Sequence, residues 1–237
     1  MTTSARQWVA ALVPGYGDHL GRHTALADAL TRTGATVLGH TIDPRITDFE
    51  TTVDSLHTLL ARIAGGGQPI VLIGLGLGGT VAVRHAQRHP AIARALVLAG
   101  PVLGSWPGVD ALVADSLPSP AVDPELLSRD PAVAPAFATD PLVWHRAYPR
   151  DTLLAIDEAL RTIDFDHPLG DELPALWLHG EEDELAPVAE TRTGMDRVRG
   201  LRFEERLYPG ARHDLFHETN ATEVVQDVLG FLDRVIL

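Results

Sequence analysis

The sequence contains neither cysteine nor lysine, and each absence removes a class of chemistry. With no cysteine among 237 residues, disulfide bonds, thiolate metal sites and a cysteine nucleophile are excluded. All 19 basic residues are arginine, which excludes Schiff-base chemistry and a lysine general base. A GC-rich coding bias is the simplest explanation for the missing lysine.

The sequence also lacks a long apolar run and an excess of positive charge. No stretch approaches the roughly 20 apolar residues of a transmembrane helix, so we expect no membrane span. The N-terminus runs into a strand without a signal-peptide pattern, and we expect a cytoplasmic protein. The net charge of −13 argues against nucleic acid as a partner. A hydrophobic content of 45% is enough for one domain with a sizeable core.

Short apolar runs alternate with segments of helical periodicity along most of the chain. The predicted strands are 8–13, 35–40, 70–73, 93–99, 175–179 and 201–208, and the predicted helices are 22–33, 48–63, 78–89, 187–198 and 222–235. This alternation predicts an α/β fold with a mostly parallel sheet and helices on both faces. Active residues of such sheets gather at the carboxyl ends of the strands.

Residues 102–170 differ in character from the rest of the chain. They are rich in proline, aspartate and alanine, contain short helical pieces and recurring apolar residues, and show no strong strand. We therefore predict a helical cap inserted at 102–170, with the α/β core formed by 1–101 and 171–237.

A glycine cluster follows the apolar run 70–73 and allows two interpretations. Gly74, Gly76 and Gly79 fit the dinucleotide-binding pattern G-x-G-x-x-G. Gly74 and Gly78 also fit the ends of the nucleophile elbow G-x-S-x-G, with Gly76 where that motif has serine.

The rest of the chain favours the elbow. A dinucleotide site requires an acidic residue at the end of the next strand, but that strand ends in Gly100 and Pro101. Two later strands are instead followed by Asp183 and His213, so that elbow, acid and histidine occur in the order of α/β-hydrolases. In that arrangement the histidine is the general base, and the acid orients it and stabilises the imidazolium.

The chain resembles the monoacylglycerol lipase/lysophospholipase-like (serine aminopeptidase S33-type) branch of the α/β-hydrolases over nearly its whole length. The matching segments are PGYGDH at 14–19, GLGLGG at 74–79, GPVLGS at 100–105, LSRDP at 127–131, DPLV at 140–143, LHGEED at 178–183 and YPGARHDLFHE at 208–218. The resemblance implies the α/β-hydrolase fold and a carboxylic-ester hydrolase scaffold. It places the triad acid at Asp183, with Glu181 or Glu182 as neighbouring alternatives, and the triad base at His213.

The resemblance also implies an oxyanion hole and a substrate pocket. Backbone amides of Tyr16 and Leu77 fall on the oxyanion-hole donors, and Gly76 falls on the vacant nucleophile position. The residues expected around the pocket are Gly15, His19, His40, Trp106 and Trp144. The expected partner is a small apolar or ester-like molecule.

Three functions remain open on the sequence. The preferred hypothesis is a diverged enzyme in which His213 and Asp183 perform elimination, isomerisation, cyclisation or water-mediated hydrolysis. The second is a non-catalytic, ligand-binding pseudo-hydrolase, and the third is a lipase whose serine was replaced by engineering. A second departure from the family, the short segment 39–48 after the second strand, favours natural divergence.

We expect no cofactor and no metal. His213 and His217 are four residues apart, as are His19 and His23, but the H-E-x-x-H pattern of a zinc site is absent. A structural role for His217 and a solvated helix start for His23 are the simpler interpretations.

Overall fold

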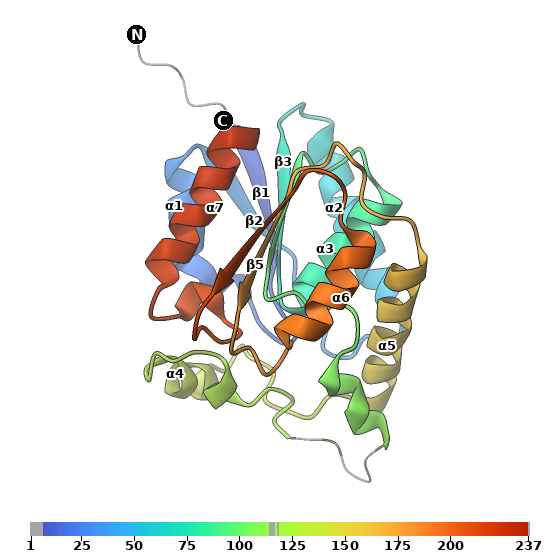
Figure 1. Ribbon diagram of the computed structural model, residues 1–237, viewed down its shortest axis with the longest axis vertical. Helices are drawn as coiled ribbons and strands as arrows, with labels where there is room; N and C mark the ends of the chain where they lie inside the picture. Colours follow the sequence, from blue (N-terminus) through green and yellow to red (C-terminus); the bar gives the residue numbers. More distant parts are fainter. Residues whose placement is uncertain (1–6, 114–116, 118, 237) are drawn as a thin grey trace.

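A six-stranded parallel sheet forms the centre of the computed structural model, which describes residues 7–113, 117 and 119–236 (Figure 1). The strands are β1 (Trp8–Val13), β2 (Ala35–Gly39), β3 (Ile70–Leu75), β4 (Ala95–Ala99), β5 (Ala175–Gly180) and β6 (Phe203–Tyr208). Their order in the sheet is β2-β1-β3-β4-β5-β6, and every neighbouring pair is parallel. All six carboxyl ends therefore meet at one edge, where the predicted site residues follow.

Helices cover both faces of the sheet (Figure 1). One face carries α2 (Phe49–Ala64), α3 (Leu77–Arg88), α5 (Arg150–Phe165) and α6 (Val188–Val198), and the other carries α1 (Thr24–Arg32) and α7 (Ala221–Val235). Two hydrophobic clusters result, one on each side of the sheet. The predicted α/β architecture is confirmed.

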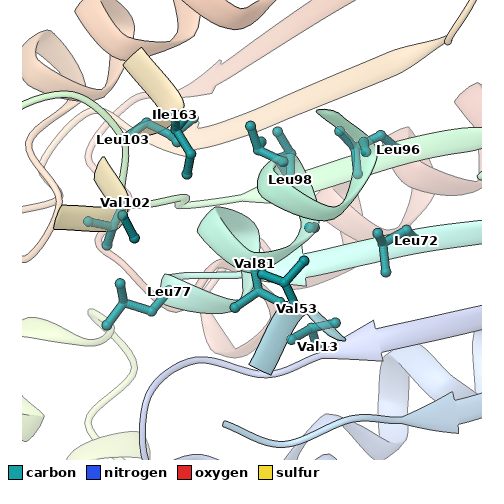
Figure 2. Close-up of a cluster of buried hydrophobic side chains, with 14 of the residues drawn as sticks. Val13, Val53, Leu72, Leu77, Val81, Leu96, Leu98, Val102, Leu103 and Ile163 are labelled. Atoms are coloured by element: carbon teal, nitrogen blue, oxygen red, sulfur yellow. The ribbon is translucent and has the colours of Figure 1, made fainter. Parts of the chain in front are cut away.

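Residues of β3 alternate between these two clusters. Leu72 packs with Val53 and Val81 on one side, as Figure 2 shows, whereas Ile73 belongs to the cluster on the other side. All six residues of β3 are buried. A strand buried on both faces needs apolar side chains at every position, which is why the run at 70–73 is continuous rather than alternating.

Local sequence signals explain most element boundaries. The side chain of Asp48 accepts a hydrogen bond of 3.0 Å from the amide of Glu50 and caps α2 as predicted. The helix predicted from residue 22 begins later, because Leu20–His23 form a 3-10 turn before α1. Periodicity over one turn does not separate these two helix types.

The predicted insertion at 102–170 contains two different parts. Its first part comprises two 3-10 helices (Pro107–Val113 and Pro124–Leu126) and α4 (Val133–Thr139), and α4 lies beyond the carboxyl ends of the strands (Figure 1). Its last helix, α5, instead buries Leu153, Ile156 and Ile163 in the same hydrophobic cluster as α2 and α3. No helix in the described part of the chain is both long and apolar enough to cross a membrane.

Candidate active site

The turn from β3 into α3 has the backbone geometry of a sharp elbow centred on Gly76. Gly76 has φ = 52° and ψ = −126°, a conformation that glycine adopts freely and that strains any residue with a side chain. Its amide donates a hydrogen bond of 3.0 Å to the carbonyl of Ala99, which fastens the elbow to β4. A Cβ atom on Gly78 would collide with the carbonyl oxygen of Val13, so the first turn of α3 packs directly on β1.

His213 and Asp183 meet at the carboxyl edge of the sheet. Asp183 follows β5 and His213 follows β6, and Nδ1 of His213 lies 2.7 Å from Oδ2 of Asp183. The other carboxylate oxygen of Asp183 accepts hydrogen bonds from the amides of Leu185 (2.9 Å) and Ala186 (2.8 Å). These contacts fix the carboxylate and, through it, the plane of the imidazole.

The two side chains perturb each other's pKa in opposite directions. Burial by itself would raise the pKa of Asp183, but the charge and hydrogen bond of His213 hold that pKa below its usual range. Burial would lower the pKa of His213, but the Asp183 carboxylate outweighs it and raises that pKa above its ordinary value. Asp214 and Asp18 add to this rise. The pair therefore has the charge distribution of a general base with its orienting acid.

The free nitrogen of His213 faces the position that a nucleophile would occupy. A Cβ atom on Gly76 would lie 3.0 Å from Nε2 of His213 and 3.7 Å from Cα of Gly15. The imidazole and the loop after β1 thus lie on either side of the position that a side chain at residue 76 would occupy.

Tyr16 and Leu77, whose amides are the predicted oxyanion-hole donors, both line the cavity beside Gly76. Within the described chain, neither the Tyr16 nor the Leu77 amide donates a hydrogen bond to a protein acceptor. Leu77 is the first residue of α3, where the amides of a helix are unpaired and carry partial positive charge. The hydroxyl of Tyr16 donates to the carbonyl of Pro44 at 2.6 Å. The phenol of Tyr16 is therefore engaged elsewhere, and its amide remains available.

A cavity of about 180 Å³ opens beside Gly76 and His213. Gly15 and Trp106, both predicted pocket residues, lie in its wall. Most of the remaining wall is apolar and comes from strand ends, the start of α3, segment 102–170 and the loops after β5 and β6: Leu75, Leu77, Ala99, Val102, Leu127, Phe137, Tyr148, Leu185, Leu215 and Phe216. Such a wall fits an apolar ligand with its polar atoms turned toward the dyad.

A charged network that the sequence did not reveal forms one side of the cavity. The guanidinium of Arg22 binds Asp18 at 2.8 Å and Asp214 at 2.9 Å, and it lies 4.7 Å from the ring centroid of Phe137. All three charged side chains are about nine-tenths buried. The four-residue spacing of Asp18 and Arg22 could have indicated one of these ion pairs. The contact between Arg22 and Asp214 joins residues far apart in sequence, so no local pattern indicates it.

Three predicted pocket residues lie outside the cavity wall. Nε2 of His19 contacts the carboxylate of Asp140 at 2.9 Å, which directs the ring toward the loop after α4. The backbone amide of Trp144 donates to the carbonyl of Gly17 at 2.9 Å, and its ring packs against arginine side chains. His40 lies in a separate surface hollow beside the start of α2. A position next to a family-like segment or a strand end therefore did not predict where these three side chains point.

Two residues behind the dyad were missed by the sequence interpretation. His179 is fully buried in β5, and its Nε2 lies 3.3 Å from Oδ2 of Asp183. Its Nδ1 accepts a hydrogen bond of 3.0 Å from the indole of Trp177. Gly100, with φ = 53°, has its Cα so close to the dyad that a Cβ atom would lie 3.5 Å from Oδ2 of Asp183. The sequence marked Gly100 as the end of a strand and the start of a family-like segment, but not as a neighbour of Asp183.

Comparison with known proteins agrees with this geometry. The chain is 27% identical over 94% of its length to a monoacylglycerol lipase of Mycolicibacterium smegmatis, covering 87% of that protein. It is 26% identical over 91% of its length to a monoglyceride lipase homolog of monkeypox virus, covering 84% of that protein.

Solved structures and a family model extend the comparison. A monoacylglycerol lipase of Paleococcus ferrophilus superposes with a TM-score of 0.79 at 22% identity, with 94% of this chain and 93% of that chain covered. A soluble variant of the Saccharomyces cerevisiae monoglyceride lipase gives a TM-score of 0.79 at 17% identity, with 98% and 88% covered. These superpositions confirm the α/β-hydrolase fold. The model of the family described as serine aminopeptidase, S33 (Hydrolase_4) matches residues 4–220, and the chain therefore belongs to this family of α/β-hydrolases.

Proposed function

We propose that this protein is an enzyme in which the His213–Asp183 pair acts as a general base on an apolar carbonyl compound, without a serine nucleophile. The observation that carries the proposal is the position of Nε2 of His213, 3.0 Å from where a Cβ atom on Gly76 would stand. An oriented base therefore faces a space that a substrate atom or a water molecule can enter. The relatives named as monoacylglycerol lipases support an ester-like or acyl-bearing substrate.

Every reaction in this class begins with the same proton transfer. Nε2 of His213 removes a proton from the substrate or from a water molecule, and Asp183 stabilises the imidazolium that forms. The negative charge that develops on the substrate oxygen is then stabilised by the amides of Tyr16 and Leu77. The reactions differ in the next step. Elimination expels a leaving group from the deprotonated substrate, and isomerisation returns the proton at another carbon. Cyclisation forms a bond within the substrate, whereas hydrolysis adds the activated water to the carbonyl carbon and expels the alcohol, which takes the proton from the imidazolium.

Ordinary serine-esterase turnover is not expected, because glycine supplies no nucleophile. Loss of one triad member in a well-studied protease still leaves roughly 10³–10⁴-fold acceleration over water from the oxyanion hole and substrate binding. Any residual ester hydrolysis by the native protein should therefore be weak and should not pass through an acyl-enzyme.

The test compares the native protein with Gly76→Ser, His213→Gln and, as a histidine control, His167→Gln, whose side chain is 60% exposed. Each is assayed on 4-nitrophenyl butyrate, on a monoacylglycerol, with a fluorophosphonate probe and on 5-nitrobenzisoxazole, a substrate that ring-opens when a base removes its proton. We expect ring opening by the native protein and by His167→Gln, and its loss in His213→Gln. Equal ring-opening rates in native protein and His213→Gln would contradict the dyad mechanism.

The apolar cavity favours one second candidate, a ligand-binding protein without catalysis. This candidate predicts that the native protein and His213→Gln bind a monoacylglycerol with the same affinity and that neither turns over any substrate. Strong esterase activity in Gly76→Ser alone, together with a serine codon in the native gene, would instead support an engineered lipase.

A further inference from the structure

Three histidines gather between α2 and α3, away from the candidate active site. His57 belongs to α2, His85 lies in the last turn of α3, and His89 directly follows the end of that helix. A ring nitrogen of each lies within 4.8 Å of a ring nitrogen of the other two. The rings of His57 and His89 are stacked, with centroids 3.5 Å apart and an interplanar angle of 13°.

Four of the six ring nitrogens of this cluster are buried and have no hydrogen-bond partner in the described chain. His85 is fully buried, and neither of its nitrogens is paired. Nδ1 of His57 and Nε2 of His89 are also buried and unpaired. Buried polar atoms in folded proteins nearly always have partners, so four unpaired nitrogens at one place call for a chemical explanation.

The protonation state of His85 suits a cation rather than an anion. Burial, followed by the proximity of His89 and His57, lowers the pKa of His85 to about 3, so this imidazole is neutral and retains a lone pair at neutral pH. Arg88, on the same helix as His85, is neutralised by Asp54 at 2.8 Å and Glu50 at 2.6 Å. The charged groups beside the histidines therefore do not repel a metal ion.

We propose that His57, His85 and His89 bind a divalent transition-metal ion of the zinc type, with water completing the coordination. Three imidazoles select zinc, cobalt, nickel or copper over magnesium and calcium, which prefer oxygen ligands. With Zn–N distances of about 2.0–2.1 Å, two nitrogens on one ion lie at most about 4.2 Å apart, so any pair of these nitrogens near the 4.8 Å limit must approach by side-chain rotation. The ion would link α2 to α3, the helix that begins at the elbow. This proposal departs from the metal-free protein expected from the sequence.

A second group with metal-ligating atoms, His23, Asp214 and His217, does not carry the same argument. His23 Nε2 already contacts Asp18 at 2.9 Å, and both nitrogens of His217 are paired, with Asp214 and with the carbonyl of Arg22, each at 2.8 Å. Apart from Nδ1 of His23, these ring nitrogens have partners without a metal, and His217 provides a control.

The experiment titrates untagged, EDTA-stripped protein with Co²⁺ and follows the visible d–d absorption, with Zn²⁺ as competitor. We expect saturation at a single site per chain and displacement of Co²⁺ by Zn²⁺. His57→Gln and His89→Gln should each weaken Co²⁺ binding by at least about tenfold, whereas His217→Gln and His167→Gln should leave it unchanged. Zn²⁺ should also raise the unfolding temperature of native protein, but not that of His89→Gln.

The outcomes separate a metal site from a packed histidine cluster. His57 and His89 are partly exposed, so the His57→Gln and His89→Gln variants are informative even where His85→Gln fails to fold. Circular dichroism establishes that these two variants are folded. Absence of the Co²⁺ spectrum in native protein, or equal affinity in native protein and both variants, would overturn the proposal. Loss of binding in His217→Gln alone would move the site to the other cluster. None of these readouts depends on the function proposed for the dyad.

Discussion

The backbone of Gly100 packs closely against His213. A Cβ atom on Gly100 would lie 3.0 Å from the carbonyl oxygen of His213 and 3.4 Å from its Nδ1. Only glycine at position 100 allows the chain at the end of β4 to pack this closely against His213 and Asp183. The position of the imidazole is thus determined from two sides, by the carboxylate of Asp183 and by the end of β4.

Gly100→Ala should destabilise the protein more than the backbone conformation alone explains. Gly67 has a similar positive φ of 72°, but a Cβ atom there meets nothing within 4 Å, so Gly67→Ala is a matched control for backbone strain. We expect a loss of about 1 kcal/mol in the free energy of unfolding for Gly67→Ala. Gly100→Ala should lose at least about 1 kcal/mol more. Equal losses in urea denaturation would mean that the contact with His213 has no energetic consequence.

Gly76→Ser should be less stable than the native protein and yet gain chemical reactivity. The backbone of residue 76 must keep φ = 52° while the serine Cβ lies 3.0 Å from Nε2 of His213. This strain should lower the free energy of unfolding by about 1–3 kcal/mol. The same closeness lets His213 accept the serine proton, so we expect labelling by the fluorophosphonate probe. The double variant Gly76→Ser/His213→Gln is the control: strong labelling that persists without His213 would contradict activation by the imidazole.

The pKa of His213 should lie above its ordinary value of 6.5. Burial alone would lower it, but the carboxylate of Asp183 raises it, so Asp183→Asn should lower it. The pKa of each form is measured by NMR titration of the imidazole. A pKa raised by folding stabilises the native state fully below pH 6.5, and this contribution is lost as the pH rises through the folded value. A native midpoint at or below 6.5 would contradict the predicted coupling.

Arg22→Met should be strongly destabilising at neutral pH. It leaves the buried carboxylates of Asp18 and Asp214 without their shared cation, which should cost about 3–5 kcal/mol. Arg161→Met is the control, because Arg161 pairs with Asp157 on the surface and is 64% exposed. Its loss should stay within about 0.5 kcal/mol.

The effect of Arg22→Met should also depend on pH in a defined direction. Burial by itself would raise the pKa of both carboxyls. His23, followed by Arg22, lowers the folded pKa of Asp18 below 3.8, and His217, followed by His23 and Arg22, lowers that of Asp214. Their stabilising contribution exists above that value and is lost as the pH falls through the folded pKa. The difference between native protein and variant should therefore shrink below about pH 4. A difference that is constant from pH 7 to pH 3 would show that lost packing, not charge, causes the defect.

The amino-acid sequence by itself determined the architecture and the positions of the dyad along the chain. Burial on both faces requires continuous apolar runs in the central strands, and this requirement is visible in residues 70–73. The parallel order then places whatever follows β5 and β6 at one edge, so Asp183 and His213 could be paired before any coordinates were known.

Only the tertiary structure determined which residues, distant in sequence, contact one another. Asp214 reaches Arg22 across 192 residues of sequence, and His57 meets His85 across the packing of two helices. The packing of α5 beside α2 and the turning of His19 toward Asp140 are contacts of the same kind. Periodicity reports which face of an element is buried, because burial depends on a residue's own polarity. Periodicity does not identify the residue that a buried side chain contacts, because that contact depends on how elements distant in sequence pack together.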